Sequence, residues 1–319
     1  SIFCIVDKDK KNSLKIRNDI TTQISRIATS RLRKLKRPLR LCYYGEVLRN
    51  QTSILRPERQ FLQVGAECIG EKSYFADVEI LILAFQSLQA VGIKNISVDF
   101  SNSIFIKSIV KKDLINSNQK DFLKHLTRKD INMALSFVKN KKKKIFIKNL
   151  IECRGNLLKN INLLKKLKIN KKFSNEIDDL IKVSKILRKK FPNIIFNVDF
   201  IDNKPLNYYS GLNFTVFAKD VRGEIASGGR YINRLQEKES GTGFACYMDT
   251  ILRASSLFIK QKKIIIPFNT SDKIIKNLYK KNFIIERVLN KNNIIIEIAK
   301  KNKCTHALLN NKIKEINYE

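Results

Sequence analysis

Cysteine and histidine are scarce in this sequence, and their positions exclude two classes of site. Among 319 residues there are two histidines and six cysteines, and no two cysteines form a CxxC pair. A zinc site needs clustered cysteine and histidine ligands, and a chain of this length does not need a disulfide framework. We therefore expect no metal site and no Ser–His–Asp triad, and we expect cysteines that are reduced and buried, as in a cytoplasmic protein.

Long apolar runs and phosphate-binding glycine loops are missing as well. No run of 18 or more apolar residues occurs, so the sequence predicts no membrane span. The first residues, SIFCIVDKDKKN, lack the parts of a signal peptide. Neither a Walker loop nor a GxGxxG after a strand is present, so no nucleotide cofactor is predicted. The chain opens with Ser1 and enters a predicted strand at once, which indicates a fragment or an incomplete gene model.

Acidic residues are outnumbered by basic ones. With 63 Lys and Arg against 29 Asp and Glu, the formal charge is +34, which is typical of a protein that meets nucleic acid or another anionic surface. The excess is mostly lysine and accompanies abundant Ile and Asn, three residues with AT-rich codons. The densest run, KNKKKKIFIK at 139–148, holds only one aromatic residue, Phe146. We expect salt-sensitive, non-specific binding, and a nucleic-acid-binding module remains one alternative function.

The hydrophobic pattern predicts an α+β fold. A hairpin is expected at 2–16, a helix at 22–35, a hairpin at 41–68, a helix at 78–91 capped by Asp77, and a strand at 95–100. Further strands are expected at 194–200, 214–219 and 224–226, followed by a glycine turn at 227–231. These elements predict an antiparallel sheet flanked by helices. Its two core segments, 1–102 and 194–256, would enclose a helical insertion at 103–193 and precede a small C-terminal α/β domain at 257–319.

The strand within Arg49–Gly70 has two unlike faces. Because side chains alternate along a strand, one face carries an apolar set: Leu62, Val64, Ala66 and Cys68. We interpret this set as a core face. The other face combines a cation, an aromatic ring, an amide, bare backbone and a carboxylate: Arg59, Phe61, Gln63, Gly65 and Glu67. A glycine inside a strand marks close approach of a ligand or of another backbone. This face predicts the floor of a pocket for a small zwitterion, although a solvent-facing strand would show the same pattern.

Eight stretches, in this order, resemble the histidyl-tRNA synthetase family, which includes synthetases and the catalytically inactive regulatory subunits of ATP phosphoribosyltransferase. They cover about the first 255 residues and read LKIRNDIT (14–21), YYGEVLRNQ (43–51), RPERQFLQVGAECIG (56–70), ADVEILILAFQSL (76–88), LTRKDINMAL (126–135), LNYYSGLNFTVF (206–217), ASGGRY (226–231) and GTGFACYMD (241–249). The resemblance implies a class II aminoacyl-tRNA synthetase-like sheet and a pocket for histidine.

The resemblance also assigns roles within that pocket, residue by residue. Asp19 and Thr21 stand where the family holds the α-amino group of its ligand, and Arg49 stands at the arginine of motif 2. Gln63 and Glu67 stand where the family contacts the amino group and the imidazole. The family's aromatic residues match Tyr208, Tyr209 and Tyr231. Asp19 and Thr21 also suit helix capping, so their pattern alone is compatible with either role.

Three departures lie on the ATP side of the implied site. Lys204 stands where synthetases have an arginine, and lysine lacks the planar fork that clamps phosphate. Thr250 follows Asp249 where motif 3 of a synthetase has an arginine. The Arg-x-Glu of motif 2 becomes Arg49-Asn50-Gln51. Loss of positioned cations should slow phosphoryl chemistry by orders of magnitude, so the resemblance implies a protein that binds histidine without activating it.

The resemblance therefore implies a non-catalytic regulatory subunit of a short-form ATP phosphoribosyltransferase. Such a subunit would bind L-histidine, associate with itself and with the catalytic subunit, and transmit feedback inhibition in histidine biosynthesis. About sixty C-terminal residues replace the larger anticodon-binding domain of a synthetase. An active histidine–tRNA ligase remains the first alternative, which pyrophosphate exchange would discriminate.

Overall fold

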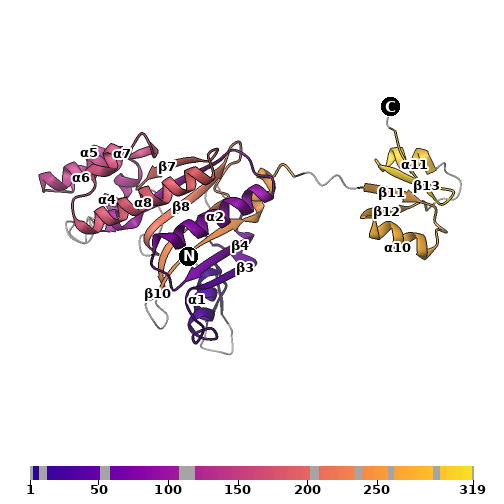
Figure 1. Ribbon diagram of the computed structural model, residues 1–319, viewed down its shortest axis with the longest axis horizontal. Coiled ribbons are helices and arrows are strands. Elements are labelled where there is room, and N and C mark those ends of the chain that lie inside the picture. The colour runs from indigo at the N-terminus through magenta and orange to yellow at the C-terminus, as the bar shows by residue number, and fades with distance from the viewer. Residues whose placement is uncertain are drawn as a thin grey trace. The chain divides into compact units, whose positions relative to one another are not determined.

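The structure is a computed structural model, which describes residues 3–6, 13–50, 58–107, 119–201, 208–233, 239–257, 262–289 and 295–317 (Figure 1). The chain forms two compact units, Ser1–Ser256 and Leu257–Glu319. Over the residues just given, none of the helices combines the length and the apolar character that a membrane span requires.

The first unit is built on a sheet that has eight strands in the described part of the chain. Their spatial order is β3 (Leu39–Leu48), β4 (Gln60–Ile69), β10 (Glu239–Tyr247), β9 (Ala226–Asn233), β8 (Tyr209–Ala218), β5 (Ile96–Asn102), β7 (Ile195–Asp199) and β6 (Arg154–Asn156). All neighbouring pairs are antiparallel except β5 and β7. A separate antiparallel hairpin, β1 (Cys4–Val6) and β2 (Ser13–Lys15), precedes the sheet.

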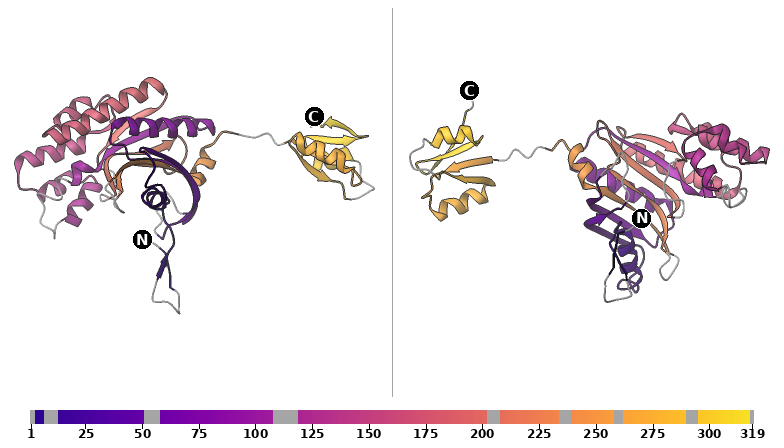
Figure 2. Two further views of the ribbon diagram at one scale, coloured as in Figure 1. Left: turned by 60° about the horizontal axis from the view of Figure 1, so that its bottom comes forward. Right: turned by 180° about the vertical axis from the view of Figure 1, so that it is seen from behind.

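Helices cover both faces of this sheet. Helix α2 (Tyr74–Ala90) lies on one face and α1 (Thr21–Thr29) on the other, as the views in Figure 2 show. The face under α2 contributes Ala66 and Cys68 of β4 to the main hydrophobic core. The face under α1 contributes Phe61 and Ile69 of the same strand to a smaller core. The two sets alternate along β4, as side chains on a strand must.

The helical insertion shares the main core with the sheet. It contains α4 (Gln119–Thr127), α5 (Ile131–Ser136), α6 (Lys141–Glu152), α7 (Ile161–Lys166) and α8 (Lys171–Lys190), which gather at one end of the sheet in Figure 1. Phe105 joins the two parts, because its ring centroid lies 4.8 Å from that of Phe173 on α8 and 4.9 Å from that of Phe200 after β7. The insertion also supplies the short edge strand β6, which the periodicity did not predict.

The second unit is a small α/β sheet. Its strand order is β12 (Phe283–Arg287), β11 (Lys262–Ile266), β13 (His306–Leu309) and β14 (Lys312–Glu315), with β11 parallel to β12 and β13. The helices of this unit are α10 (Asp272–Lys280) and α11 (Ile295–Lys301). Ile264 and Ile266 belong to one core cluster and Ile265 to a second, so β11 is buried on both faces. The terminal strand β14 was not predicted.

Three local predictions are wrong. Helix α1 ends at Thr29, well before residue 35. Helix α2 is capped by Ser73, whose Oγ accepts from Phe75 N, whereas Asp77 lies in the first turn and pairs with Arg230. The glycines at 227–231 lie inside strand β9 and form no turn. A Cβ at Gly228 would come within 2.2 Å of Gly243 O, so these glycines permit close strand packing.

Two burial predictions also need correction. Leu62 and Val64 were interpreted as core residues, but each side chain is 37% exposed. Ala66 and Cys68 of the same set are buried, as predicted. Among the cysteines, Cys4 and Cys42 are exposed, while the other four are buried.

Candidate functional site

A small cavity of about 30 Å³ lies where α1 begins, above the central strands of the first unit. Its lining comes from the start of α1, from β4, β8, β9 and β10, and comprises Asp19, Thr21, Glu67, Tyr208, Tyr209, Ser227, Gly228, Gly229, Tyr231, Gly243, Phe244, Ala245 and Tyr247. The polar groups are thus two carboxylates, two hydroxyls and four tyrosines. The face of β4 that was predicted to form a pocket floor does contribute, through Glu67.

Glu67 is the central polar group of this cavity. Its side chain is 2% exposed, and Thr21 Oγ1 donates to Oε1 at 3.0 Å. The Tyr231 hydroxyl donates to Oε2 at 3.1 Å. Burial raises the pKa of Glu67 to about 8, although the hydrogen bonds from Thr21 and Tyr231 counteract this shift. The carboxyl group therefore holds a proton near neutral pH until a cation or a strong donor enters the cavity.

A glycine opposite Glu67 makes room for the carboxylate. Gly243 of β10 pairs with Glu67 across the strands, and a Cβ at Gly243 would lie 1.8 Å from Glu67 Oε2. Gly65, two residues earlier on β4, has a related role: a Cβ there would lie 2.2 Å from Phe244 O and 2.5 Å from the ring of Tyr43. The predicted close approach at Gly65 is confirmed, and its partners are a backbone and an aromatic ring.

Tyrosine rings form the walls of the cavity. The Tyr208 ring stacks on Tyr231 at a centroid distance of 6.0 Å and meets Tyr209 edge-on at 4.9 Å. Burial raises the pKa of both Tyr209 and Tyr231 above the ordinary range, so their hydroxyls remain neutral hydrogen-bonding groups. Flat, half-apolar walls of this kind suit a planar ring.

Asp19 places a second carboxylate at the cavity. Its Oδ1 accepts from Thr21 N at 2.7 Å, so the side chain also orders the first turn of α1. Ile20, which occupies the N-cap position, has no side-chain cap. The two roles left open for Asp19, a capping one and a ligand-facing one, are therefore both compatible with its position. Asp19 and Glu67 together could accept the hydrogens of an amino group and of a ring N–H.

Two of the eight predicted site residues do not line the cavity. Gln63 is fully buried, and its Oε1 accepts from Ile20 N at 3.3 Å, while its Nε2 has no hydrogen-bond partner. The Arg49 guanidinium lies over the rings of Phe61 and Tyr247, 4.9 Å and 5.6 Å from their centroids. Arg49 thus lies against Tyr247, which lines the cavity, and its Nε donates to Asn18 O at 3.4 Å. The structure brings the other six together: Asp19, Thr21, Glu67, Tyr208, Tyr209 and Tyr231.

The prediction missed two hydrogen-bonding residues of the lining. Ser227 Oγ and the Tyr247 hydroxyl lie 2.6 Å apart, and both face the cavity. A signal for them was present in the sequence. Ser227 lies an even number of residues from Tyr231, and Tyr247 an even number from Gly243, so the members of each pair share a strand face. This spacing is informative only once both segments are known to be strands.

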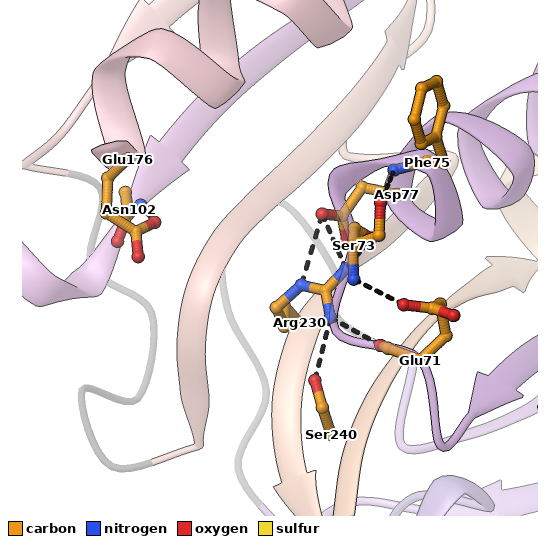
Figure 3. A network of polar contacts seen from close by, with 8 residues as sticks. All are labelled: Glu71, Ser73, Phe75, Asp77, Asn102, Glu176, Arg230 and Ser240. Atoms are coloured by element: carbon orange, nitrogen blue, oxygen red, sulfur yellow. Dashed lines mark hydrogen bonds and ion pairs between the residues drawn. The ribbon is translucent and has the colours of Figure 1, made fainter. Parts of the chain in front are cut away.

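A buried ion pair on the opposite face of β9 fixes this strand (Figure 3). The guanidinium of Arg230 donates to Asp77 Oδ2 from Nη2 at 2.9 Å and from Nε at 3.2 Å. It also donates to the carbonyls of Glu71 and Ser73 and to Ser240 Oγ, each at 2.8 Å. The start of α2 is therefore tied to β9 and β10, next to the residue whose hydroxyl contacts Glu67.

The structure describes one of the three predicted departures in full and a second, Arg49-Asn50-Gln51, in part. Lys204 lies outside the described residues, as does Gln51. Thr250 is buried at the start of α9 (Met248–Ala254), and Arg253 Nη2 donates to its Oγ1 at 3.3 Å. Arg253 is a cation one turn beyond the motif position, but it also pairs with Glu58 and Asp249, at 3.2 Å and 3.6 Å. Metal ligation is not indicated, since the described residues contain no suitable group of three or more ligands.

Comparison with known sequences shows which proteins this chain is similar to. The model of the family described as histidyl-tRNA synthetase matches residues 1–251. The chain is 31% identical over 269 residues to the ATP phosphoribosyltransferase regulatory subunit of Rhodospirillum centenum, covering 84% of this chain and 69% of the relative. It is 33% identical over 300 residues to the subunit of the same name from Thermoanaerobacter pseudethanolicus, covering 88% and 76%.

Solved structures show the same fold. An ATP phosphoribosyltransferase regulatory subunit/histidyl-tRNA synthetase from Bacillus halodurans superposes with a TM-score of 0.76 at 21% identity, covering 94% of this chain and 81% of that one. Histidyl-tRNA synthetase from Nostoc gives 0.73 at 16% identity, covering 97% and 78%. A chain of the ATP phosphoribosyl transferase (HisG:HisZ) complex from Thermotoga maritima gives 0.60 at 19% identity, covering 76% and 84%.

Proposed function

The chain belongs to the histidyl-tRNA synthetase family, within its branch of ATP phosphoribosyltransferase regulatory subunits, and from this premise we propose that it binds L-histidine in the cavity at Glu67 and regulates a catalytic subunit in response. Its partner would be the ATP phosphoribosyltransferase catalytic subunit. In the cytoplasm, this chain would assemble with that subunit and with copies of itself. The complex would carry out the first step of histidine biosynthesis.

The arrangement around Glu67 carries this proposal. A buried carboxyl group, held by Thr21 and Tyr231, lies between tyrosine walls that suit an imidazole ring. An imidazole N–H donates to a carboxylate, and an imidazolium ion would ionise Glu67 by ion pairing. Asp19 offers an acceptor for the α-amino group at the same cavity. A zwitterion with a cationic or donor ring therefore matches these groups.

A regulatory role is favoured over histidine activation. Thr250 replaces a cation at the expected ATP site, and the nearby Arg253 is engaged with Glu58 and Asp249. Activation of an amino acid by ATP needs cations that are free to hold phosphate. The curated relatives named above are regulatory subunits, and the Thermotoga maritima relative is part of a complex. Histidine would act by binding two arrangements of the complex unequally, and the coupling would be reciprocal.

Calorimetric titration with L-histidine tests the ligand. We expect saturable binding to the wild-type chain and at least about tenfold weaker binding to Glu67→Gln, because the amide cannot form an ion pair with the ring. Glu152→Gln, at an exposed position on α6, is the matched control and should bind as the wild type does. The pocket assignment is wrong if histidine does not bind, or if Glu67→Gln and Glu67→Ala leave binding unchanged.

Reconstitution with the catalytic subunit of the same organism tests the regulation. Initial rates of phosphoribosyl-ATP formation should rise on addition of this chain, and histidine should inhibit only in its presence. Pyrophosphate exchange with histidine and ATP should be absent. Exchange at a synthetase-like rate, without stimulation of the catalytic subunit, would instead establish the histidine–tRNA ligase alternative.

A further inference from the structure

A second hollow surface lies at the end of the first unit that carries β6, on the insertion. Helices α7 and α8, the edge strand β6 and its neighbour β7 surround it. Figure 1 shows α7, α8 and β7 at the same end of the first unit. Two adjoining hollows of about 460 Å³ and 190 Å³ share Leu157, Leu158 and Arg188 in their lining. We call the pair of hollows the basic groove. It takes no part in the cavity at Glu67, with which it has no lining residue in common.

The floor of the basic groove is apolar and uncovered. Leu158 is 45% exposed and Ile195 is 56% exposed, and both line the groove. Ile161 of α7 and Ile181 of α8 extend the apolar lining and are half-buried. Adjacent exposed aliphatic side chains over a hollow are typical of a surface that binds another protein.

The rim of the groove is positively charged. Lys185, Arg188 and Lys189 line it from the C-terminal half of α8, and all three are exposed. The described part of the chain provides no carboxylate that pairs with any of them. The sequence contains no Asp or Glu at 153–175 or at 180–198, the two segments that form the groove. An occupant with acidic side chains would therefore meet no opposing charge there.

The shape and chemistry favour one class of occupant. Addition of a strand to the sheet edge is disfavoured, because β6 has only three residues and Gly155 within it has φ +86°. Nucleic acid is disfavoured, because the lining offers no exposed aromatic ring on which a base could stack. An amphipathic helix fits both features, since its apolar side chains would fill the hollow and its acidic side chains would face the rim.

We propose that the basic groove docks an acidic amphipathic helix of the catalytic subunit. The identity of this partner rests on the proposed function, whereas the chemistry of the occupant rests on the groove itself. Apolar side chains of the helix would cover Leu158 and Ile195, and its carboxylates would pair with Lys185, Arg188 and Lys189. Such pairs at a rim steer association and make it sensitive to salt.

Binding of the catalytic subunit to the full chain, followed by sedimentation velocity or calorimetry, tests this surface. We expect Leu158→Asp, and separately the pair Lys185→Glu and Arg188→Glu, to weaken binding at least about tenfold. Ile169→Asp and Lys171→Glu are the matched controls, because both side chains are exposed on the insertion but do not line the groove. Both controls should bind as the wild type does, and thermal unfolding should show that every variant is folded.

The outcomes separate this inference from the proposed function. If the wild-type chain does not bind the catalytic subunit, the regulatory function and this surface both fail. If the wild type and the folded groove variants bind it equally well, only the groove assignment fails. A single-stranded RNA oligonucleotide, followed by fluorescence anisotropy, provides the remaining arm. Weakened oligonucleotide binding with unchanged subunit binding would identify the groove as a nucleic-acid surface and would overturn the proposal.

Discussion

The chemistry of the main cavity depends on a buried carboxyl group and on the absence of one side chain. Glu67 accepts two hydrogen bonds, but it has no cation beside it in the described structure, which is why burial raises its pKa. Gly243 provides the space for the carboxylate. A ligand cation would supply the missing charge, so binding and ionisation of Glu67 should be coupled.

The raised pKa of Glu67 predicts how stability depends on pH. The pKa is about 8 in the folded chain against an ordinary value of 4.5, so the folded state retains a proton that the unfolded state releases. The contribution of Glu67 is thus complete below pH 4.5 and is lost as the pH rises towards 8, at about 1.4 kcal/mol per pH unit. Glu67→Gln lacks this dependence and should gain stability relative to the wild type over that range.

Urea unfolding of both proteins at pH 5, 6, 7 and 8 measures the effect. The difference between their free energies of unfolding cancels the contribution of the other titrating groups. Parallel profiles for the two proteins would show that Glu67 has an ordinary pKa in the folded chain.

At the scale of elements, strand β9 connects the cavity to the helical face of the sheet. Its alternate residues point to opposite faces, so Tyr231 contacts Glu67 while Arg230 contacts Asp77. Arg230 also donates to the carbonyls of Glu71 and Ser73 at the start of α2. The position of the strand that carries Tyr231 is therefore fixed from behind by a charged pair.

Removal of this pair should destabilise the chain strongly. Arg230 is 13% exposed and Asp77 is 7% exposed at the side chain, so Arg230→Ala leaves a buried carboxylate without its cation. We expect a loss of about 3–5 kcal/mol in the free energy of unfolding. The control is Arg40→Ala, which removes the exposed pair with Glu79 and should have little effect. Equal losses of unfolding free energy for the two variants in chemical denaturation would show that the buried Arg230–Asp77 pair stabilises the chain no more than the exposed Arg40–Glu79 pair does.

At the scale of the whole molecule, the chain consists of two units with separate cores. The hydrophobic clusters around β11 contain residues of the second unit alone. The cavity at Glu67 and the basic groove both belong to the first unit. The two surfaces differ in charge. The rim of the basic groove carries lysine and arginine and, among the described residues, no carboxylate, whereas the cavity at Glu67 is lined by two carboxylates.

A core substitution in the second unit tests whether this unit unfolds independently of the first. Ile265 is fully buried in β11, and Ile265→Ala should destabilise the second unit by about 2–5 kcal/mol. Hydrogen exchange should then show faster exchange in β11, β12 and β13, with unchanged protection in β4 and β10. Equally accelerated exchange in both units would show that they unfold together.

Much of the fold followed from local patterns. The alternation of residue types in 59–68 predicted a strand with two unlike faces. Glu67, on the face that carries the polar residues, does line a cavity. The alternation of strands and helices after residue 257 predicted the small α/β unit. Together with the motifs, these patterns predicted the class II synthetase-like α+β fold, which the structural comparisons confirm. Such patterns are readable because each one is set by neighbours within a few residues.

Other features were decided only when distant segments met. The space for Glu67 comes from Gly243, which is its cross-strand partner, and the charge on Asp77 is met by Arg230 from another strand. Leu62 and Val64 share their strand face with the buried Ala66, yet each of them is 37% exposed. A strand's period shows which side chains share a face but not what will pack against that face. The sequence by itself therefore determined the elements and the residue types of the site, while tertiary packing decided which of them are buried, paired or left open, because burial and pairing depend on contacts between residues far apart in the chain.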